Sequence, residues 1–221
     1  AGDLRKWMTM SNLPAIGFAD MYEHGHFRWN HFAEEGVADN DWVTEIRWIV
    51  PYLLKMRNKE GMFYEGTGLG GTARKLPGMS WWYENHSGCY GDNSDNRFTD
   101  NVPGSGDERQ IRTAYNPMVQ YITQYILMRA ASVLRRYDSV LANEAVEAAA
   151  LSWEYTQKHP EDEEGACKLT ATLSWRLQAA VELCKAGCIP ARCQEEALND
   201  LLSLQDREYG FWYYDKMRCT P

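Results

Sequence analysis

Apolar residues recur along much of this chain at the spacing of an α-helix. In the segment 41–57 they stand at i, i+4, i+7, i+8, i+11 and i+14, which is one stripe of a 3.6-residue helix. The stripe consists of Trp42, Ile46, Ile49, Val50, Leu53 and Met56. Asp41 fits an N-cap and Gly61 a stop signal, whereas Pro51 is expected to kink the helix or break it locally.

The middle of the chain predicts an antiparallel pair of helices. The first covers residues 111–136, and its apolar positions are Val119, Ile122, Ile126 and Val133. The second covers residues 140–158 and follows a short Tyr-Asp-Ser connection, in which Asp138 or Ser139 is expected to cap it.

Three more helices are expected toward the two ends of the chain. One covers 166–186, with a stripe made of Leu169, Leu173, Leu177, Ala180, Val181 and Cys184. Gly187 is expected to end it, and Pro190 to begin another helix that runs to about residue 204. The segment 4–23 is also predicted to be helical, with Pro14 as a defect. No run of alternating strand residues is convincing, so the predicted fold class is all-α.

Two long polar segments interrupt this pattern, at residues 61–80 and 84–109. Loops of this length on a helical scaffold often carry functional sites. Between them stand Trp81, Trp82 and Tyr83, with His86 close behind. These rings either close the top of the core or form a platform on which a sugar ring stacks.

The charge balance excludes some partners. The 221 residues contain 23 Lys+Arg and 31 Asp+Glu, a net charge of −8, and no polybasic cluster. This argues against a nucleic-acid or anionic-membrane surface. No stretch approaches the roughly 18 consecutive apolar residues of a membrane span, and the chain has no phosphate loop, serine-hydrolase elbow or zinc-protease helix motif.

Metal sites are weakly indicated. His24, His26 and His31 lack the i, i+4 spacing that places two imidazoles on one helical face, which favours a solvated loop. The segment 92–96 alternates oxygen-bearing side chains but fails the EF-hand pattern at Arg97, so an Asx-rich turn is favoured over calcium. The six cysteines are read as buried or free thiols rather than as zinc ligands. No cofactor is expected, and a family-specific calcium site at 92–96 stays open as the alternative.

Several motifs together resemble glycoside hydrolase family 9, the cellulases built as an (α/α)6 toroid. The chain opens with Ala-Gly-Asp at 1–3 and Lys-Trp at 6–7, which is similar to the family's Asp-Ala-Gly-Asp signature without its leading Asp. Further similar blocks are Met21-Tyr22-Glu23, the run 45–56, and the stretch from Asp107 through Trp153 to His159-Pro160. The resemblance covers most of the chain and is weakest over residues 61–106.

The resemblance implies an inverting glycoside hydrolase that acts on β-1,4-linked glucan or a related polysaccharide or oligosaccharide and is extracellular or periplasmic. In such enzymes one carboxylate deprotonates a water while a second carboxylic acid protonates the leaving oxygen. Asp3 matches the signature Asp that is the general base, and Trp81, Trp82, Tyr83 and His86 lie where the family binds sugar.

The resemblance also implies that residues 1–221 form only part of the catalytic domain. The leading Asp and the distal acidic Glu are not found, and six or seven helices are too few for a closed toroid. The expected partners are therefore the glycan and the remaining part of the domain, and these residues alone are expected to be inactive. Two alternatives stay open, namely a non-catalytic carbohydrate-binding role and another toroid sugar enzyme such as an epimerase or polysaccharide lyase.

Overall fold

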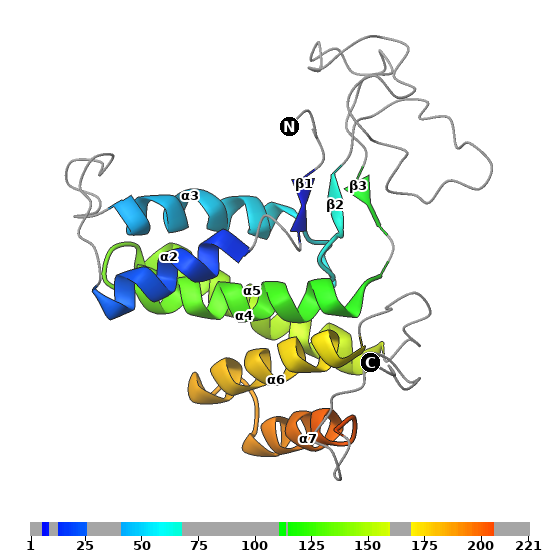
Figure 1. The fold of residues 1–221 in the computed structure, drawn as a ribbon. Helices are drawn as coiled ribbons and strands as arrows, with labels where there is room; N and C mark the ends of the chain where they lie inside the picture. The colour runs from blue at the N-terminus through cyan, green and yellow to red at the C-terminus, as the bar shows by residue number, and fades with distance from the viewer. Residues whose placement is uncertain are drawn as a thin grey trace, which may run out of the picture.

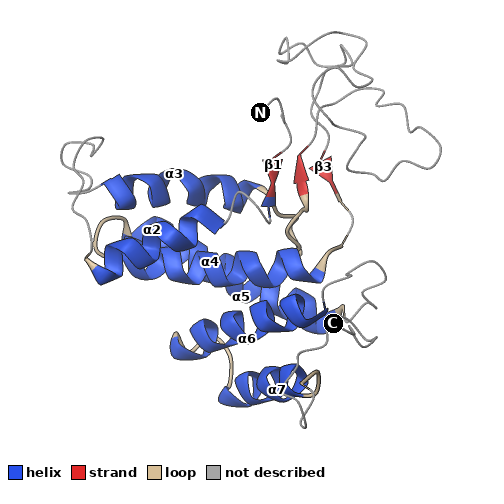
Figure 2. Cartoon of the chain, in the orientation of Figure 1, coloured by secondary structure: helices blue, strands red, loops and turns tan. Residues whose placement is uncertain are grey.

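Helices make up most of the part of the chain that the computed structural model describes, which is residues 6–8, 13–25, 41–67, 111–113, 115–159 and 169–205. The helices are α2 (Leu13–His24), α3 (Asp41–Lys55), α4 (Pro117–Leu134), α5 (Ser139–Lys158), α6 (Leu169–Lys185) and α7 (Ala191–Leu202). Three strands of two residues each, β1 (Lys6–Trp7), β2 (Gly66–Thr67) and β3 (Ile111–Arg112), form one small sheet (Figure 2). The predicted all-α class is confirmed. Within these described ranges, no helix is long and apolar enough to cross a membrane.

The helices pack as three successive antiparallel hairpins, α2/α3, α4/α5 and α6/α7 (Figure 1). The first helices of neighbouring hairpins also lie side by side, because α4 contacts both α2 and α6 extensively. The contact between the second helices α3 and α5 is smaller. Such an arrangement, in which one row of helices is packed more closely than the other, is that of part of an α/α toroid.

Helix α4 lies at the centre of the core, which explains its composition. It contacts α2, α3, α5 and α6, and most of its side chains are buried. The four apolar positions predicted for this segment, Val119, Ile122, Ile126 and Val133, are all buried. On α5, the facing positions are small: Ala142, Ala145, Ala148 and Ala149 are buried. Small side chains let the two helices approach closely over the length of the hairpin.

Helix α4 begins later than its apolar pattern predicts, so the predicted helix over 111–136 is wrong for its first six residues. The Asn116 side chain caps the helix by accepting from the amides of Met118 and Val119, and Pro117 occupies the first helical position. Residues 111–112 instead pair with β2. A cap and a proline at N1 are strong local start signals that overrode the periodicity upstream.

The predicted ends of α5 and α6 are confirmed. Asp138 caps α5, with its side chain accepting from the amide of Leu141 at 3.0 Å. At the end of α6, Gly187 has φ +73°, and its amide donates to the carbonyl of Cys184 while that of Cys188 donates to Leu183. This pair of bonds is the Schellman motif, which satisfies carbonyls that the helix end leaves unpaired.

The structure contradicts the single helix predicted over 4–23 and the local break expected at Pro51. The segment 4–23 is not one helix, because β1 occupies residues 6–7 and α2 begins at Leu13. Pro14 is the second residue of α2, where a missing N–H removes no intrahelical bond. Helix α3 does not break at Pro51 but continues to Lys55, held by the burial of Val50 and Leu53 on either side.

The buried face of α6 is rotated from the predicted stripe. Ala180 is buried as predicted, and Thr172, Ala179 and Leu183, which the predicted stripe does not include, are buried as well. The predicted positions Leu173, Leu177, Val181 and Cys184 are only half-buried, and the side chain of Leu169 is outside the described set. Helix α6 packs against α4 on one side and α7 on the other, so it has two contact faces rather than one. For α3, by contrast, Ile46, Val50, Leu53 and Met56 are buried as predicted.

Candidate functional site

The three short strands bring together segments that lie far apart in the sequence. Lys6 pairs with Thr67 and Trp7 with Gly66, and Gly66 and Thr67 pair in turn with Arg112 and Ile111. Strand β2 is therefore central, and Thr67 and Ile111, which are 44 positions apart in the sequence, are paired in this sheet (Figure 1). The amide of Met8 extends the ladder by donating to the carbonyl of Glu65 at 3.0 Å.

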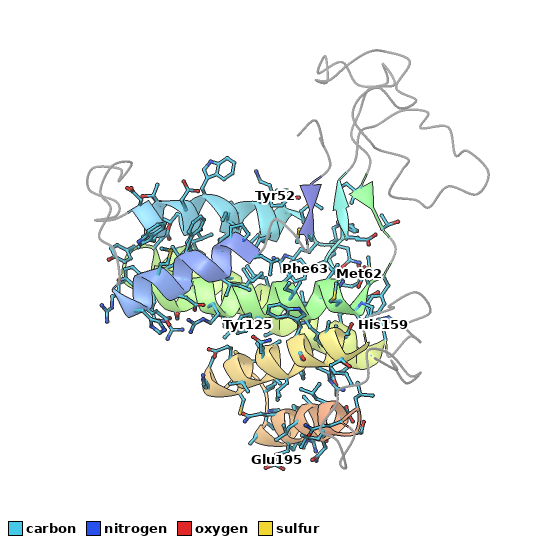
Figure 3. The ribbon with its side chains drawn as sticks, in the orientation of Figure 1. Tyr52, Met62, Phe63, Tyr125, His159 and Glu195 are labelled. Carbon is cyan, nitrogen blue, oxygen red and sulfur yellow. The ribbon has the colours of Figure 1, made fainter. Side chains whose placement is uncertain are left out.

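The sheet is fastened to the start of α4 by polar side chains. Gln120 is fully buried, and its amide bonds the main chain of Phe63 in both directions, with Nε2 donating to the carbonyl at 2.8 Å and Oε1 accepting from the N–H at 2.7 Å. Asn116 Nδ2 also donates to a carboxylate oxygen of Glu65 at 3.4 Å. Figure 3 shows Met62 and Phe63 between the sheet and the helices. The segment that leads into β2 is thus fixed to the core.

A tight turn joins α3 to this segment. The amide of Asn58 donates to the carbonyl of Met62 at 2.9 Å, and the amide of Met62 donates to Asn58 Oδ1 at 2.8 Å. Gly61 has φ +103°, and a Cβ there would lie 2.8 Å from Leu151 Cγ. Only glycine fits a backbone with this φ that also touches a helix so closely. Arg57 and Phe63 close the turn as a β-bridge.

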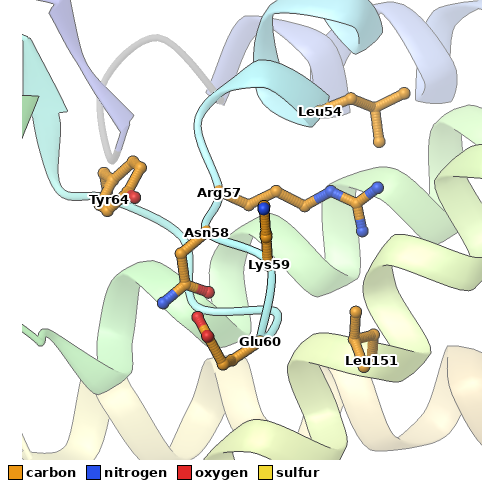
Figure 4. A pocket seen from close by; sticks show the side chains of 7 residues that line it. All are labelled: Leu54, Arg57, Asn58, Lys59, Glu60, Tyr64 and Leu151. Carbon is orange, nitrogen blue, oxygen red and sulfur yellow. The ribbon is translucent and has the colours of Figure 1, made fainter.

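A cavity of about 620 Å³ lies between this turn and helix α5 (Figure 4). It is lined by Leu54, Arg57, Asn58, Lys59, Glu60, Tyr64 and Leu151. Its wall combines two cationic side chains, one carboxylate, one amide and one aromatic ring. None of these residues is among the predicted site residues, because a Lys-Glu-Gly turn after a helix has no sequence signal beyond the turn itself.

An aromatic cluster lies where α5 ends and α4 begins. The rings of Tyr155 and His159 are stacked with centroids 4.0 Å apart, and Tyr115 lies against Tyr155 at 5.9 Å. His159 Nδ1 donates to the carbonyl oxygen of Tyr155 at 2.9 Å. All three side chains are half-buried. The i, i+4 spacing of Tyr155 and His159 on one helix face is the signal that could have found this cluster.

A charged network joins α2 to α4. Arg129 Nη2 lies 2.7 Å from Asp20 Oδ1 and 2.7 Å from Glu23 Oε2. Burial lowers the pKa of Arg129, but its hydrogen bonds to the two carboxylates outweigh this, so the pKa is raised overall. Burial also raises the pKa of Tyr125, with Arg129 acting in the opposite direction and Glu182 adding to the rise. Since both carboxylates are engaged by one guanidinium, this network joins helices rather than offering a free acid and base.

The predicted site residues fall outside the described part of the chain. Asp3 precedes the described residues, and Trp81, Trp82, Tyr83 and His86 belong to segment 68–110. His26, His31 and the segment 92–96 are also outside them, as are Cys89, Cys167 and Cys219.

The described cysteines and metal-ligating side chains give no metal centre. Cys184, Cys188 and Cys193 are free thiols. Burial raises the pKa of the Cys188 thiol, with Arg135 acting in the opposite direction. Within the described ranges, no group of three or more His, Cys, Asp or Glu side chains is arranged to hold a metal ion.

Sequence comparison gives no match to any protein-family model and none to curated proteins. Comparison of the fold gives matches to solved structures. A metagenome-derived glycoside hydrolase family 9 endoglucanase superposes with a TM-score of 0.61 over 92% of this chain and 34% of its own, at 19% identity. The fold of this chain is part of the family 9 fold. The resemblance drawn from the sequence motifs is thereby confirmed at the level of the fold.

Other solved structures of family 9 agree. A zinc-binding triple mutant of a family 9 endoglucanase gives a TM-score of 0.62 over 96% of this chain and 38% of its own, at 16% identity. A family 9 protein of Bacteroides ovatus gives 0.59 over 90% and 36%, at 14% identity. The chain thus spans about a third of the length of the family 9 structures it matches. The partial α/α toroid expected from the motifs is the fold observed.

Proposed function

We propose that this chain forms part of the catalytic domain of an inverting glycoside hydrolase that cleaves β-1,4-linked glucan. The observation that carries the proposal is the similarity of fold to family 9 structures, two of them endoglucanases, over 90% or more of this chain. The proposed reaction uses two carboxyl groups and a water molecule, and no cofactor. An extracellular or periplasmic location goes with a polymeric glycan substrate.

In this proposal Asp3 is the general base. Three peptide units link Asp3 to Lys6 in β1, which limits their Cα separation to about 11 Å. Strand β1 pairs with β2, which leads into the segment that contains Trp81, Trp82, Tyr83 and His86. The proposal therefore places the base close to the sheet.

The aromatic cluster of Tyr115, Tyr155 and His159 supports a glycan cleft at this end. Tyr155 and His159 lie at the end of α5, and Tyr115 lies just before α4, which begins beside the sheet. Aromatic faces suit the apolar C–H face of a pyranose ring, while hydroxyl and imidazole groups suit its hydroxyls. We assign this cluster to substrate positioning.

The test measures the hydrolysis of carboxymethylcellulose as the release of reducing sugar. It uses the longest form of the protein that can be isolated. Asp3→Asn should lower kcat by at least about 10²-fold, since a proton-transfer role contributes that much. The matched control is Glu144→Gln, which neutralises an exposed carboxylate on α5. Activity of Asp3→Asn equal to wild type would overturn the assignment of the base.

A second candidate is non-catalytic glycan binding, which the half-buried aromatic cluster of Tyr115, Tyr155 and His159 also supports. Cellopentaose binding by the 221-residue chain, followed by tryptophan fluorescence, distinguishes the two. Under this candidate Trp81→Ala and Trp82→Ala weaken binding, and no form of the protein hydrolyses the glucan. Trp48→Ala is the control, because that ring is 78% exposed on α3.

A further inference from the structure

The cavity beside α5 has a rigid cationic rim. Its rim is the 57–64 hairpin, defined here as the residues from Arg57 to Tyr64. The hairpin is closed by the Arg57–Phe63 bridge and by the hydrogen bonds between Asn58 and Met62. The main chain of Phe63 also forms two hydrogen bonds with the buried side chain of Gln120. A turn held in this way has little conformational freedom to lose when a ligand binds.

The two cations of the hairpin form no ion pair with any other described residue. Salt bridges in the described part of the chain involve Arg47, Arg129, Lys158, Arg176 and Lys185. Neither Arg57 nor Lys59 takes part in one, although both line the cavity and Arg57 is half-buried. Glu60, the one carboxylate of the lining, is exposed and pairs with neither cation. A half-buried guanidinium that no described carboxylate pairs with favours an anionic ligand.

The rest of the lining suits a sugar ring. The Tyr64 ring and the side chains of Leu54 and Leu151 supply apolar surface (Figure 4). Asn58 uses its Oδ1 to accept from the amide of Met62, which leaves Nδ2 as a donor toward a hydroxyl. A cavity of about 620 Å³ has room for one or two sugar units.

We propose that this cavity binds a carboxylated sugar unit, that is, a uronic acid residue of an acidic polysaccharide. Arg57 and Lys59 would meet the carboxylate, Asn58 a hydroxyl, and Tyr64 the apolar face of the ring. The choice of a sugar rests on the proposed function, whereas the choice of an anion rests on the two unpaired cations. Glu60 repels the ligand and limits its affinity.

The test titrates the 15N-labelled 221-residue chain with three probes at equal ionic strength. The probes are β-1,4-linked tetraglucuronate, neutral cellotetraose and sodium sulfate, and the readouts are the amide signals of Gly61 and of the Asn58 side chain. Tetraglucuronate should shift both signals and bind at least about tenfold more tightly than cellotetraose, because only it carries the carboxylate. Raising the salt concentration should weaken this binding.

Charge variants then locate the site. Arg57→Gln should weaken tetraglucuronate binding about tenfold, and Lys59→Gln about threefold, since a lysine is a point charge on a flexible stem. Glu60→Gln should tighten it about twofold. Arg136→Gln is the control, because it removes an equal charge from an exposed side chain at the far end of α4. Lys59 and Glu60 are exposed, so their variants keep the test informative even if Arg57→Gln unfolds.

Several results would overturn this proposal. They are equal binding of the neutral and acidic tetrasaccharides, binding of sulfate without binding of tetraglucuronate, and unchanged affinity in both Lys59→Gln and Glu60→Gln. The proposed hydrolase function fails separately, since it depends on Asp3 and is measured as release of reducing sugar. Asp3→Asn should leave tetraglucuronate binding unchanged.

Discussion

The side-chain amide of Gln120 pairs with the main chain of Phe63 as a neighbouring strand would. Gln120 Nε2 donates to the Phe63 carbonyl at 2.8 Å, and the Phe63 amide donates to Gln120 Oε1 at 2.7 Å. Both residues are fully buried, so water cannot replace either bond. This pair joins the central helix α4 to the hairpin that leads into β2, and hence links the core to the proposed functional end.

Replacing Gln120 by Leu should therefore be costly. It leaves the N–H and the carbonyl of Phe63 buried and unpaired, at about 1–3 kcal/mol for each group. We expect the free energy of unfolding to fall by about 2–5 kcal/mol in urea denaturation. Gln178→Leu is the control, because its bond goes to a carbonyl within its own helix, and it should change stability by less than about 0.5 kcal/mol. Equal effects of the two substitutions would contradict this account.

Two glycines should respond to alanine with opposite signs. Gly61 has φ +103°, and its added Cβ would lie 2.9 Å from the carbonyl oxygen of Leu151. Gly61→Ala should destabilise the protein by about 2 kcal/mol or more, from backbone strain and this clash. Gly17 lies in α2 with nothing within 4 Å of an added Cβ, so Gly17→Ala should stabilise by up to about 1 kcal/mol. Thermal unfolding of both variants measures the two signs, and a stable Gly61→Ala protein would refute the close packing described.

Asp138 has two roles that substitutions can separate. Its Oδ1 caps α5, and its Oδ2 lies 3.3 Å from Arg47 Nη2 on α3. Asp138→Ala removes both interactions and should cost about 1–2 kcal/mol. Asp138→Asn keeps an oxygen for the cap and should cost less than about 1 kcal/mol. Urea denaturation of the two variants and of Arg47→Met measures each part, and an equal loss in both Asp138 variants would mean that the ion pair dominates.

Stability should fall at high pH through Tyr125. Burial raises the pKa of Tyr125 above its ordinary value of 10.0, opposed by Arg129 and aided by the charges of Asp20, Glu182 and Glu23. Above about pH 10 the unfolded chain loses this proton while the folded protein keeps it, so the free energy of unfolding declines through the folded-state pKa. Tyr125→Phe should show a shallower decline between pH 9 and 11 in urea denaturation. A slope equal to that of wild type would show that Tyr125 does not contribute.

Helix boundaries are predicted best where a cap or a glycine marks the helix end in the local sequence. The Asp138 cap and the Gly187 stop depend on residues within one turn of the helix end, so sequence alone identifies the stop and limits the cap to Asp138 or Ser139. On α3, Ile46, Val50, Leu53 and Met56 are buried as predicted, whereas Trp42 and Ile49 of the same stripe are half-buried. The rotation of the α6 stripe was not predictable, since it depends on α4 and α7 contacting that helix from two sides.

The residues proposed for function also fall into those that the sequence indicates and those that only the fold brings together. Sequence motifs indicate Asp3 and the aromatic residues at 81–83, and their resemblance to family 9 agrees with the observed fold. The cavity at the 57–64 hairpin and the cluster around His159 escape that reasoning. Each is made by side chains from different elements, and nothing in the spacing of Arg57 and Leu151 shows that they line one cavity.

The sequence by itself determined the all-α class, most helix ends and the resemblance to a toroidal glycoside hydrolase, because helix periodicity and caps are local. Only the tertiary structure decided the sheet that joins residues 6–7, 66–67 and 111–112. Strands of two residues are too short to show an alternating pattern, and their pairing comes from the packing of the helices that carry them. The same packing buries Gln120, whose polar side chain marks it as a core residue only once Phe63 lies against it.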